Sequence, residues 1–352
     1  MLLAGAAPAR ATPLCLPPVF EGGERLHTSP APRVNRLQLA LRQHQLCWHA
    51  AWRPEELRVV VLGSSAVYGL GVWGSETFSA LLTADLRADG IDARLFNLAW
   101  VNPYQLRDAV ILREAMAYRP DVIVYPVTKA EFVHQAPTLW KSLHAFLSVN
   151  RDVLREMAAD PPHGLEEPVE RYAAILDRWD EKAPPLERLR EIGSFARAAA
   201  GDLGRALPTA LGARPRTPGG DRRPARDYDC AETLAKREES FRDWQSWNIL
   251  AELGRLHEET GVEVVVVYWP LGSDPQGLCY NARFTYEDMI EFGDWLAAQA
   301  AERQLAYVDL NGALGDGDFF DTVHVRAPGH RKIAERLRAP LTEALARARR
   351  AP

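Results

Sequence analysis

Short apolar runs recur along the chain and are separated by longer stretches in which apolar residues have helical spacing. Residues 59–62 form one such run, rich in β-branched valine, and Gly63 follows it directly. A run of this composition is typical of a strand buried on both faces, and it predicts a strand over residues 58–62. The same pattern predicts strands at residues 92–97, 120–125, 262–268 and 305–310.

Amphipathic stretches between these strands predict helices. Residues 75–89, for example, carry Phe78, Leu82 and Leu86 on one side. The other predicted helices lie at residues 34–52, 104–118, 139–157, 236–259, 286–303 and 328–347. Strands that alternate with helices over short connections form right-handed βαβ units, so the pattern predicts an α/β fold. We expect a doubly wound, five-stranded parallel sheet with helices on both faces.

The alternation stops in the middle third of the chain, where we expect a helical insertion at about residues 138–235. Within it, residues 208–229 contain four prolines and five arginines. This composition cannot bury much apolar surface and is typical of a flexible loop. The expected organisation is a partly disordered N-terminal arm at residues 1–56, followed by one α/β domain at residues 57–350.

Charge and cysteine content exclude several classes of protein. The formal net charge of -5 argues against a nucleic-acid-binding protein, which would carry clustered lysine and arginine. The four cysteines form no CxxC pair and therefore indicate neither a zinc site nor a redox motif. No apolar run is long enough for a transmembrane helix. We expect no metal ion and no cofactor, and the sequence leaves the oligomeric state open.

The first seven residues are mostly apolar but follow no lysine or arginine, whereas a secretory signal normally has a positive flank. A proline- and alanine-rich tail on a cytoplasmic protein is therefore the favoured interpretation. Export remains the alternative, and in that case two of the four cysteines could form a disulfide.

Ser65 follows the first strand, at the edge of a parallel sheet where ligands bind. A serine nucleophile needs a base and a carboxylate that orients this base. Asp321 and His324 offer both groups in a loop after the last strand. Because the carboxyl ends of parallel strands meet at one edge, this loop can reach Ser65. The other interpretations of Ser65 are a phosphate-binding turn and a structural turn or helix-cap residue.

Three motifs together resemble the SGNH, or GDSL-like, hydrolase family over residues 57–132 and 236–345. They are Gly63-Ser64-Ser65 followed by Gly69, Asp321-x-x-His324, and Gly329-His330-x-x-Ile333-Ala334. The resemblance implies a flavodoxin-like sheet. It also implies that Ser65 is the nucleophile, His324 the general base and Asp321 the residue that orients the base. His330 is expected to pack at the start of the last helix.

The resemblance also indicates where an oxyanion would be held. In the family, the backbone N–H of the nucleophile and that of a glycine in an Asn-x-Gly motif are donors, and this chain has Ala99 in place of that glycine. The third family donor is an asparagine after the third strand, but Ala130 stands at or next to its position. Thr128, Lys129 or Asn102 could substitute. The loss of one such donor typically costs about 100- to 1000-fold in turnover.

Two further features have alternative interpretations. Trp269 directly follows the fourth strand and is a candidate ligand-binding residue, whereas Trp244 and Trp247 have helical spacing and are expected in the core. The stretch from Asp316 to Asp318 lacks the spacing of a calcium loop and is expected to be a solvated loop.

The resemblance implies a serine esterase that acts through an acyl-enzyme. Analogy with family members that have long insertions indicates a short acyl ester on a small molecule or a glycan as substrate. Two alternatives remain. One is an O-acyltransferase with the same triad, and the other is a catalytically weak binding protein that keeps the fold.

Overall fold

The computed structural model of the chain describes residues 56–99, 104–116, 119–132, 151–182, 248–273, 279–280 and 284–349. The predicted N-terminal arm, the helix at 34–52 and the loop at 208–229 lie outside these residues. Asn102, Trp244 and Trp247 lie outside them as well.

The described residues form a five-stranded parallel sheet in the order β2-β1-β3-β4-β7. The strands are β1 (Leu57–Val61), β2 (Ala93–Asn97), β3 (Val122–Val127), β4 (Glu263–Tyr268) and β7 (Ala306–Asp309). Each coincides with a predicted strand to within two residues, so the predicted α/β sheet is confirmed. The order reverses at β1, and β1 therefore has β2 on one side and β3 on the other.

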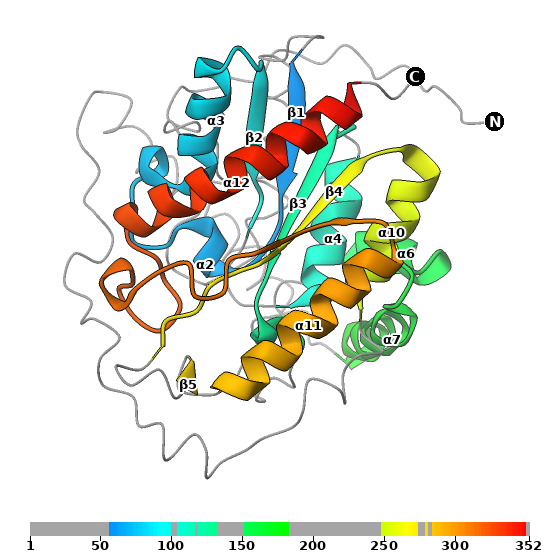
Figure 1. Cartoon of the computed structure of the whole chain (residues 1–352). Helices are drawn as coiled ribbons and strands as arrows, with labels where there is room; N and C mark the ends of the chain where they lie inside the picture. Colours follow the sequence, from blue (N-terminus) through cyan, green and yellow to red (C-terminus); the bar gives the residue numbers. More distant parts are fainter. Residues whose placement is uncertain are drawn as a thin grey trace, which may run out of the picture.

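Helices cover both faces of this sheet (Figure 1). On one face lie α3 (Phe78–Ala88) and α12 (Ala327–Ala348). On the other lie α4 (Gln105–Met116), α10 (Ile249–Thr260) and α11 (Tyr286–Glu302). Short elements complete the domain: α2 (Ser65–Tyr68), the 3-10 helices η2 (Gly74–Glu76), η3 (Lys129–Phe132) and η5 (Asp316–Asp318), and a hairpin of β5 (Cys279–Tyr280) and β6 (Phe284–Thr285).

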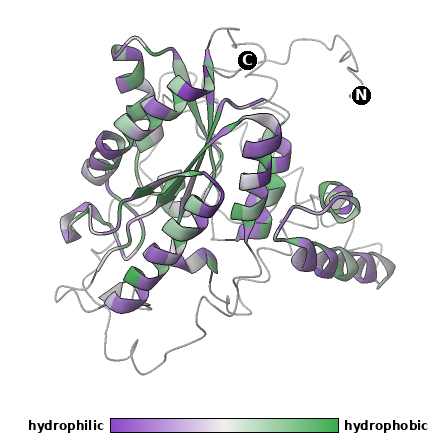
Figure 2. Ribbon diagram, turned by 45° about the vertical axis from the view of Figure 1, so that its right-hand side comes forward, coloured by the Kyte–Doolittle hydropathy of each residue, from purple (hydrophilic) through white to green (hydrophobic). Residues whose placement is uncertain are grey.

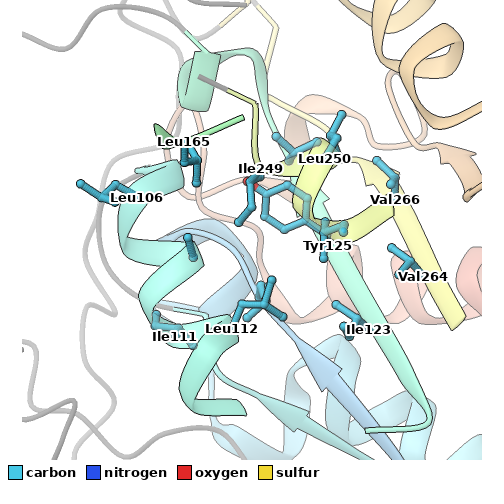
Figure 3. Packing of buried hydrophobic residues seen from close by; sticks show 14 of the residues in the cluster. Leu106, Ile111, Leu112, Ile123, Tyr125, Leu165, Ile249, Leu250, Val264 and Val266 are labelled. Carbon is cyan, nitrogen blue, oxygen red and sulfur yellow. The ribbon is translucent and has the colours of Figure 1, made fainter. Parts of the chain in front are cut away.

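The core forms because alternate strand residues face opposite helix layers. Ile123 and Tyr125 of β3 point toward α4 and α10 (Figure 3), and Val60 of β1 belongs to the same cluster, whereas Val59 and Val61 pack with α3 and α12. Figure 2 shows hydrophobic strands at the centre and hydrophilic residues along the helices. None of the described helices is long and apolar enough to cross a membrane.

Part of the predicted helical insertion is described and packs on the domain. It contains α6 (Arg151–Ala159) and α7 (Glu166–Lys182), and α7 was not singled out from the sequence. Leu154, Leu165 and Val169 join the same apolar core as α4 and α10. The described part of the insertion is therefore anchored to the face that α4 and α10 cover.

One predicted helix is wrong in extent. The predicted helix over residues 236–259 does not run through Asn248, whose backbone is not helical and whose side chain accepts a hydrogen bond from Leu250 N at 3.1 Å; residues 236–247 lie outside the described part of the chain. An asparagine side chain that satisfies a free N–H of the first turn is a typical helix start. Hence α10 begins at Ile249.

Candidate active site

The turn after β1 presents Ser65 at the carboxyl edge of the sheet. Gly63 has φ +122°, and a Cβ at this position would lie 2.8 Å from Val67 Cγ2 and 3.1 Å from the carbonyl oxygen of Pro126. Only glycine therefore fits this turn. Ser65 is the first residue of α2, and its side chain stays partly accessible.

The structure brings Ser65, His324 and Asp321 together. His324 Nε2 lies 3.0 Å from Ser65 Oγ. The other ring nitrogen, Nδ1, lies 2.8 Å from Asp321 Oδ2 and 3.0 Å from Asp321 Oδ1. This is the geometry of a nucleophile, a base and an orienting carboxylate, all within hydrogen-bond reach.

Asp321 determines which tautomer of His324 is favoured. Burial by itself raises the pKa of a carboxyl, but hydrogen bonds from the His324 side chain and from Val323 N and His324 N outweigh burial and lower the pKa of Asp321 to about 2. This carboxylate is the acceptor for Nδ1–H in the tautomer of His324 that leaves Nε2 unprotonated. The lone pair on Nε2 then faces the Ser65 hydroxyl.

The loop that carries Asp321 and His324 is closed by backbone hydrogen bonds. Phe320 N donates to His324 O at 2.8 Å, and Arg326 N donates to Asp318 O at 2.7 Å. Gly272, just beyond β4, donates from its N–H to Thr322 O at 2.9 Å. These bonds fix the base relative to β4.

Phe320 connects this loop to the segment after the nucleophile. A Cβ at Gly71, which has φ +98°, would lie 3.1 Å from the Phe320 ring. On this ring lies the Arg326 guanidinium, 4.9 Å from its centroid. Packing between the two segments therefore supports the contact between Ser65 and His324.

Two expected oxyanion donors are engaged elsewhere, which corrects the sequence prediction. Ala99 N donates to the Asn97 side chain at 3.1 Å, and Ala99 is completely buried. Both Thr128 N and Thr128 Oγ1 donate to Glu131 Oε2. A hydroxyl has one proton to donate, so Thr128 Oγ1 cannot also serve an oxyanion in this arrangement.

Lys129 is engaged as well, because its Nζ lies 3.1 Å from Asp288 Oδ1. Of the oxyanion donors expected from the sequence, the backbone N–H of Ser65 is the one among the described residues that is not engaged in this way. It begins α2 and has no acceptor within this part of the chain.

Trp269 is not a ligand-binding residue, contrary to expectation. Its side chain is completely buried, with the ring edge-on to Phe78 at 5.2 Å between centroids and 6.5 Å from the His330 ring. The residue continues the alternation of β4 and points to the α3 and α12 face. His330 is buried beside it and accepts a hydrogen bond from Phe78 N at 3.3 Å, which confirms its predicted packing role.

The stretch from Asp316 to Asp318 is not simply a solvated loop. Asp318 is buried and accepts hydrogen bonds from Lys332 Nζ at 2.7 Å and from Gly315 N at 2.9 Å. The described residues contain no group of three or more His, Cys, Asp or Glu that could hold a metal ion.

A buried polar cluster behind the site was missed by the sequence analysis. It consists of Arg107, Asp108, Tyr125 and Glu131, all of which are buried. Burial raises the pKa of Asp108 even though Arg107 is paired with it. Burial also raises the pKa of Glu131, to about 7, with hydrogen bonds from Thr128 opposing the shift and the charge of Asp108 adding to it.

Replacing Glu131 by glutamine is expected to remove a pH dependence of stability. The folded pKa of about 7 exceeds the ordinary value of 4.5, so the folded state keeps a proton that the unfolded chain loses between these values. The free energy of unfolding of the wild type should therefore fall as the pH rises from about 4.5 to about 7. The expected gain of Glu131→Gln over wild type is about 3 kcal/mol at pH 8 and near zero at pH 4.

Urea unfolding at several pH values measures this difference. The exposed Glu258→Gln on α10 is the matched control and should follow the wild type. A constant difference between Glu131→Gln and wild type across this range would contradict the expectation.

Among known proteins, the chain is similar only to solved structures. No family model matches the chain, and no curated protein matches it. Similar solved structures include TesA, at 13% identity over 82% of this chain and 99% of that chain, with a TM-score of 0.39. The acetyl xylan esterase AlAXEase is similar at 12% identity over 81% of this chain and 100% of that chain, also with a TM-score of 0.39. The lipase/acylhydrolase from Enterococcus faecalis is similar at 12% identity over 82% of this chain and 96% of that chain, with a TM-score of 0.39.

Proposed function

We propose that the protein is a serine hydrolase that cleaves carboxylic esters through an acyl-enzyme. The observation that carries the proposal is the 3.0 Å contact between Ser65 Oγ and His324 Nε2, with Asp321 on the opposite ring nitrogen. A structural turn residue would need neither partner. A phosphate-binding turn would not need a base opposite its hydroxyl.

In the proposed reaction, Ser65 Oγ attacks the ester carbonyl carbon while His324 Nε2 takes the hydroxyl proton. The tetrahedral intermediate collapses, the bond to the alcohol oxygen breaks, and the alcohol leaves with the proton from His324. A water molecule then attacks the acyl group with His324 again as base. The carboxylic acid departs, and Ser65 regains its proton.

The Ser65 N–H is the proposed donor to the developing oxyanion. Since Ala99 N–H and Thr128 are bonded within the protein, fewer donors remain than in the family that the sequence resembles. Each missing donor of this type costs about 100- to 1000-fold in turnover. We therefore expect slow turnover unless these donors are released when substrate binds.

The proposed substrate is a short acyl ester on a small molecule or a glycan, a class indicated only by the sequence resemblance. The chemistry assigned to these three residues requires no metal ion and no cofactor.

The engagement of Ala99 and Thr128 favours one second candidate, a binding protein that keeps the triad but turns over little. A panel of p-nitrophenyl esters with acyl chains of increasing length separates the two. An esterase releases nitrophenol continuously, whereas the second candidate releases at most one equivalent per protein. Release at the buffer rate for every ester would overturn the proposal. Acyl transfer to added glycans that outruns hydrolysis would identify the protein as an O-acyltransferase.

A further inference from the structure

A buried arginine contacts the turn that carries the nucleophile. Arg107 lies in the first turn of α4, and its side chain is 1% exposed. Its Nη2 donates a hydrogen bond to the carbonyl oxygen of Gly63 at 3.0 Å. Gly63 precedes Ser65 by two residues, so the arginine contacts the backbone of the nucleophile turn itself.

The charge of Arg107 is balanced next to the turn. Arg107 Nε donates to Asp108 Oδ1 at 3.0 Å, and Nη2 also contacts this oxygen. The second oxygen, Asp108 Oδ2, accepts a hydrogen bond from the Tyr125 hydroxyl at 3.4 Å. Tyr125 belongs to β3 and faces α4 across the core (Figure 3). These hydrogen bonds form a chain that links α4, the nucleophile turn and β3.

Burying two charges is expensive and gives little net stability compared with an apolar pair. A charged pair in this place therefore calls for another reason. The guanidinium has several N–H donors in a fixed plane and can hold a carboxylate and a carbonyl at once. An apolar side chain would leave the Gly63 carbonyl without this donor.

The Gly63 carbonyl controls how Ser65 is presented. The peptide between Gly63 and Ser64 lies between two fixed points. On one side Leu62 N donates to Val124 O at 3.0 Å, and on the other Ser64 O accepts from Val67 N and Tyr68 N at the start of α2. A hydrogen bond to the carbonyl of this peptide sets its plane, and with it the direction in which the chain enters α2.

We propose that Arg107 is a positioning residue for the nucleophile. It holds the Gly63 carbonyl so that Ser65 Oγ stays within hydrogen-bond reach of His324 Nε2. The inference rests on the proposed function, since it assigns Arg107 to the same reaction. Arg107 acts through the backbone and does not touch the reacting atoms.

Arg107→Lys tests this role, with p-nitrophenyl acetate as substrate and a fluorophosphonate as the probe of Ser65. Lysine keeps a positive charge next to Asp108, but it has a single nitrogen in place of the planar guanidinium with its several N–H donors. We expect kcat and the labelling rate of Ser65 to fall about 10- to 100-fold, with KM changed less than about twofold, because displacement of the nucleophile affects the chemical step.

The control is Arg94→Lys. Arg94 Nε pairs with the buried Glu56 at 3.0 Å at the amino end of the same sheet, far from the nucleophile turn. This variant replaces a partly buried guanidinium that pairs with a buried carboxylate, and it should keep kcat and the labelling rate within about twofold of wild type. If Arg107→Lys does not fold, the double variant Arg107→Gln/Asp108→Asn removes both charges together and should show the same fall in kcat.

The outcomes separate the two proposals. If the wild type is active and the folded Arg107→Lys variant, or the double variant, is as active as Arg94→Lys, the positioning role alone is overturned. A wild type with neither hydrolysis nor labelling overturns the proposed function, and the positioning role with it. An equal loss in the Arg94→Lys variant would show that any arginine paired with a buried carboxylate has this effect and would also overturn the role.

Discussion

Ser65→Ala is expected to lower kcat for ester hydrolysis by at least about a thousandfold. The variant removes the oxygen that forms the acyl-enzyme, and His324 keeps no hydroxyl to activate. Steady-state hydrolysis of the best ester from the panel measures the loss. The fold should be unaffected, because the Ser65 side chain is not part of the core and, within the described residues, hydrogen-bonds to His324 alone.

Ser64→Ala is the matched control for this substitution. Ser64 lies in the same turn, has an extended backbone and makes no side-chain cap hydrogen bond to α2. Its variant should keep wild-type turnover. If Ser64→Ala and Ser65→Ala lost activity equally, the turn and not the hydroxyl of Ser65 would be responsible. Wild-type turnover in Ser65→Ala would exclude Ser65 as the nucleophile.

Asp321→Asn is expected to lower kcat by about 10,000-fold, as the loss of an orienting carboxylate does in serine proteases. The asparagine can still accept hydrogen bonds from Val323 N and His324 N through its oxygen. Its amide group then faces His324 Nδ1 as a donor. The imidazole proton moves to Nε2, and the base loses the lone pair that faces Ser65.

The pH range of this experiment follows from the pKa of Asp321. Because the folded pKa of about 2 lies below the ordinary 3.8, the carboxylate stabilises the fold at pH values above about 4. This contribution is lost as the pH falls toward 2. Activity should be compared near neutral pH, where Asp321 is ionised.

Asp316→Asn serves as the control for the Asp321 substitution. Asp316 is exposed in the same loop, and its side chain accepts a hydrogen bond from Ser273 and not from His324. Its variant should retain full turnover. A loss in Asp321→Asn no larger than that in Asp316→Asn would exclude Asp321 as the residue that orients the base.

The sheet could be predicted because its central strands are short apolar runs buried on both faces, as at residues 59–62. Such runs leave little choice of secondary structure. Trp269 shows the limit of this reasoning. Its place at the end of β4 indicated an accessible edge, but its direction depends on strand alternation and on the cover that α12 provides. Asn248 shows another limit, because its capping hydrogen bond competes with an otherwise continuous helical pattern.

The positions of Ser65, Asp321 and His324 could be predicted for a topological reason, since carboxyl ends of parallel strands share an edge. The oxyanion donors could not. Whether the N–H of Ala99 is available depends on the Asn97 side chain two residues away, and the availability of Thr128 depends on Glu131. The only signal for Arg107 in the sequence was a charged pair between apolar residues of α4. Sequence alone does not tell which turn of this helix is buried.

Labelling of the folded wild type with a fluorophosphonate, followed by peptide mass spectrometry, tests the central claim most directly. The probe reacts with a serine that an adjacent base activates. We predict one adduct per chain on Ser65, none on Ser64, and a strongly reduced labelling rate in Asp321→Asn. Absence of an adduct on Ser65 in the folded wild type, or equal labelling of Ser65→Ala, would contradict the account.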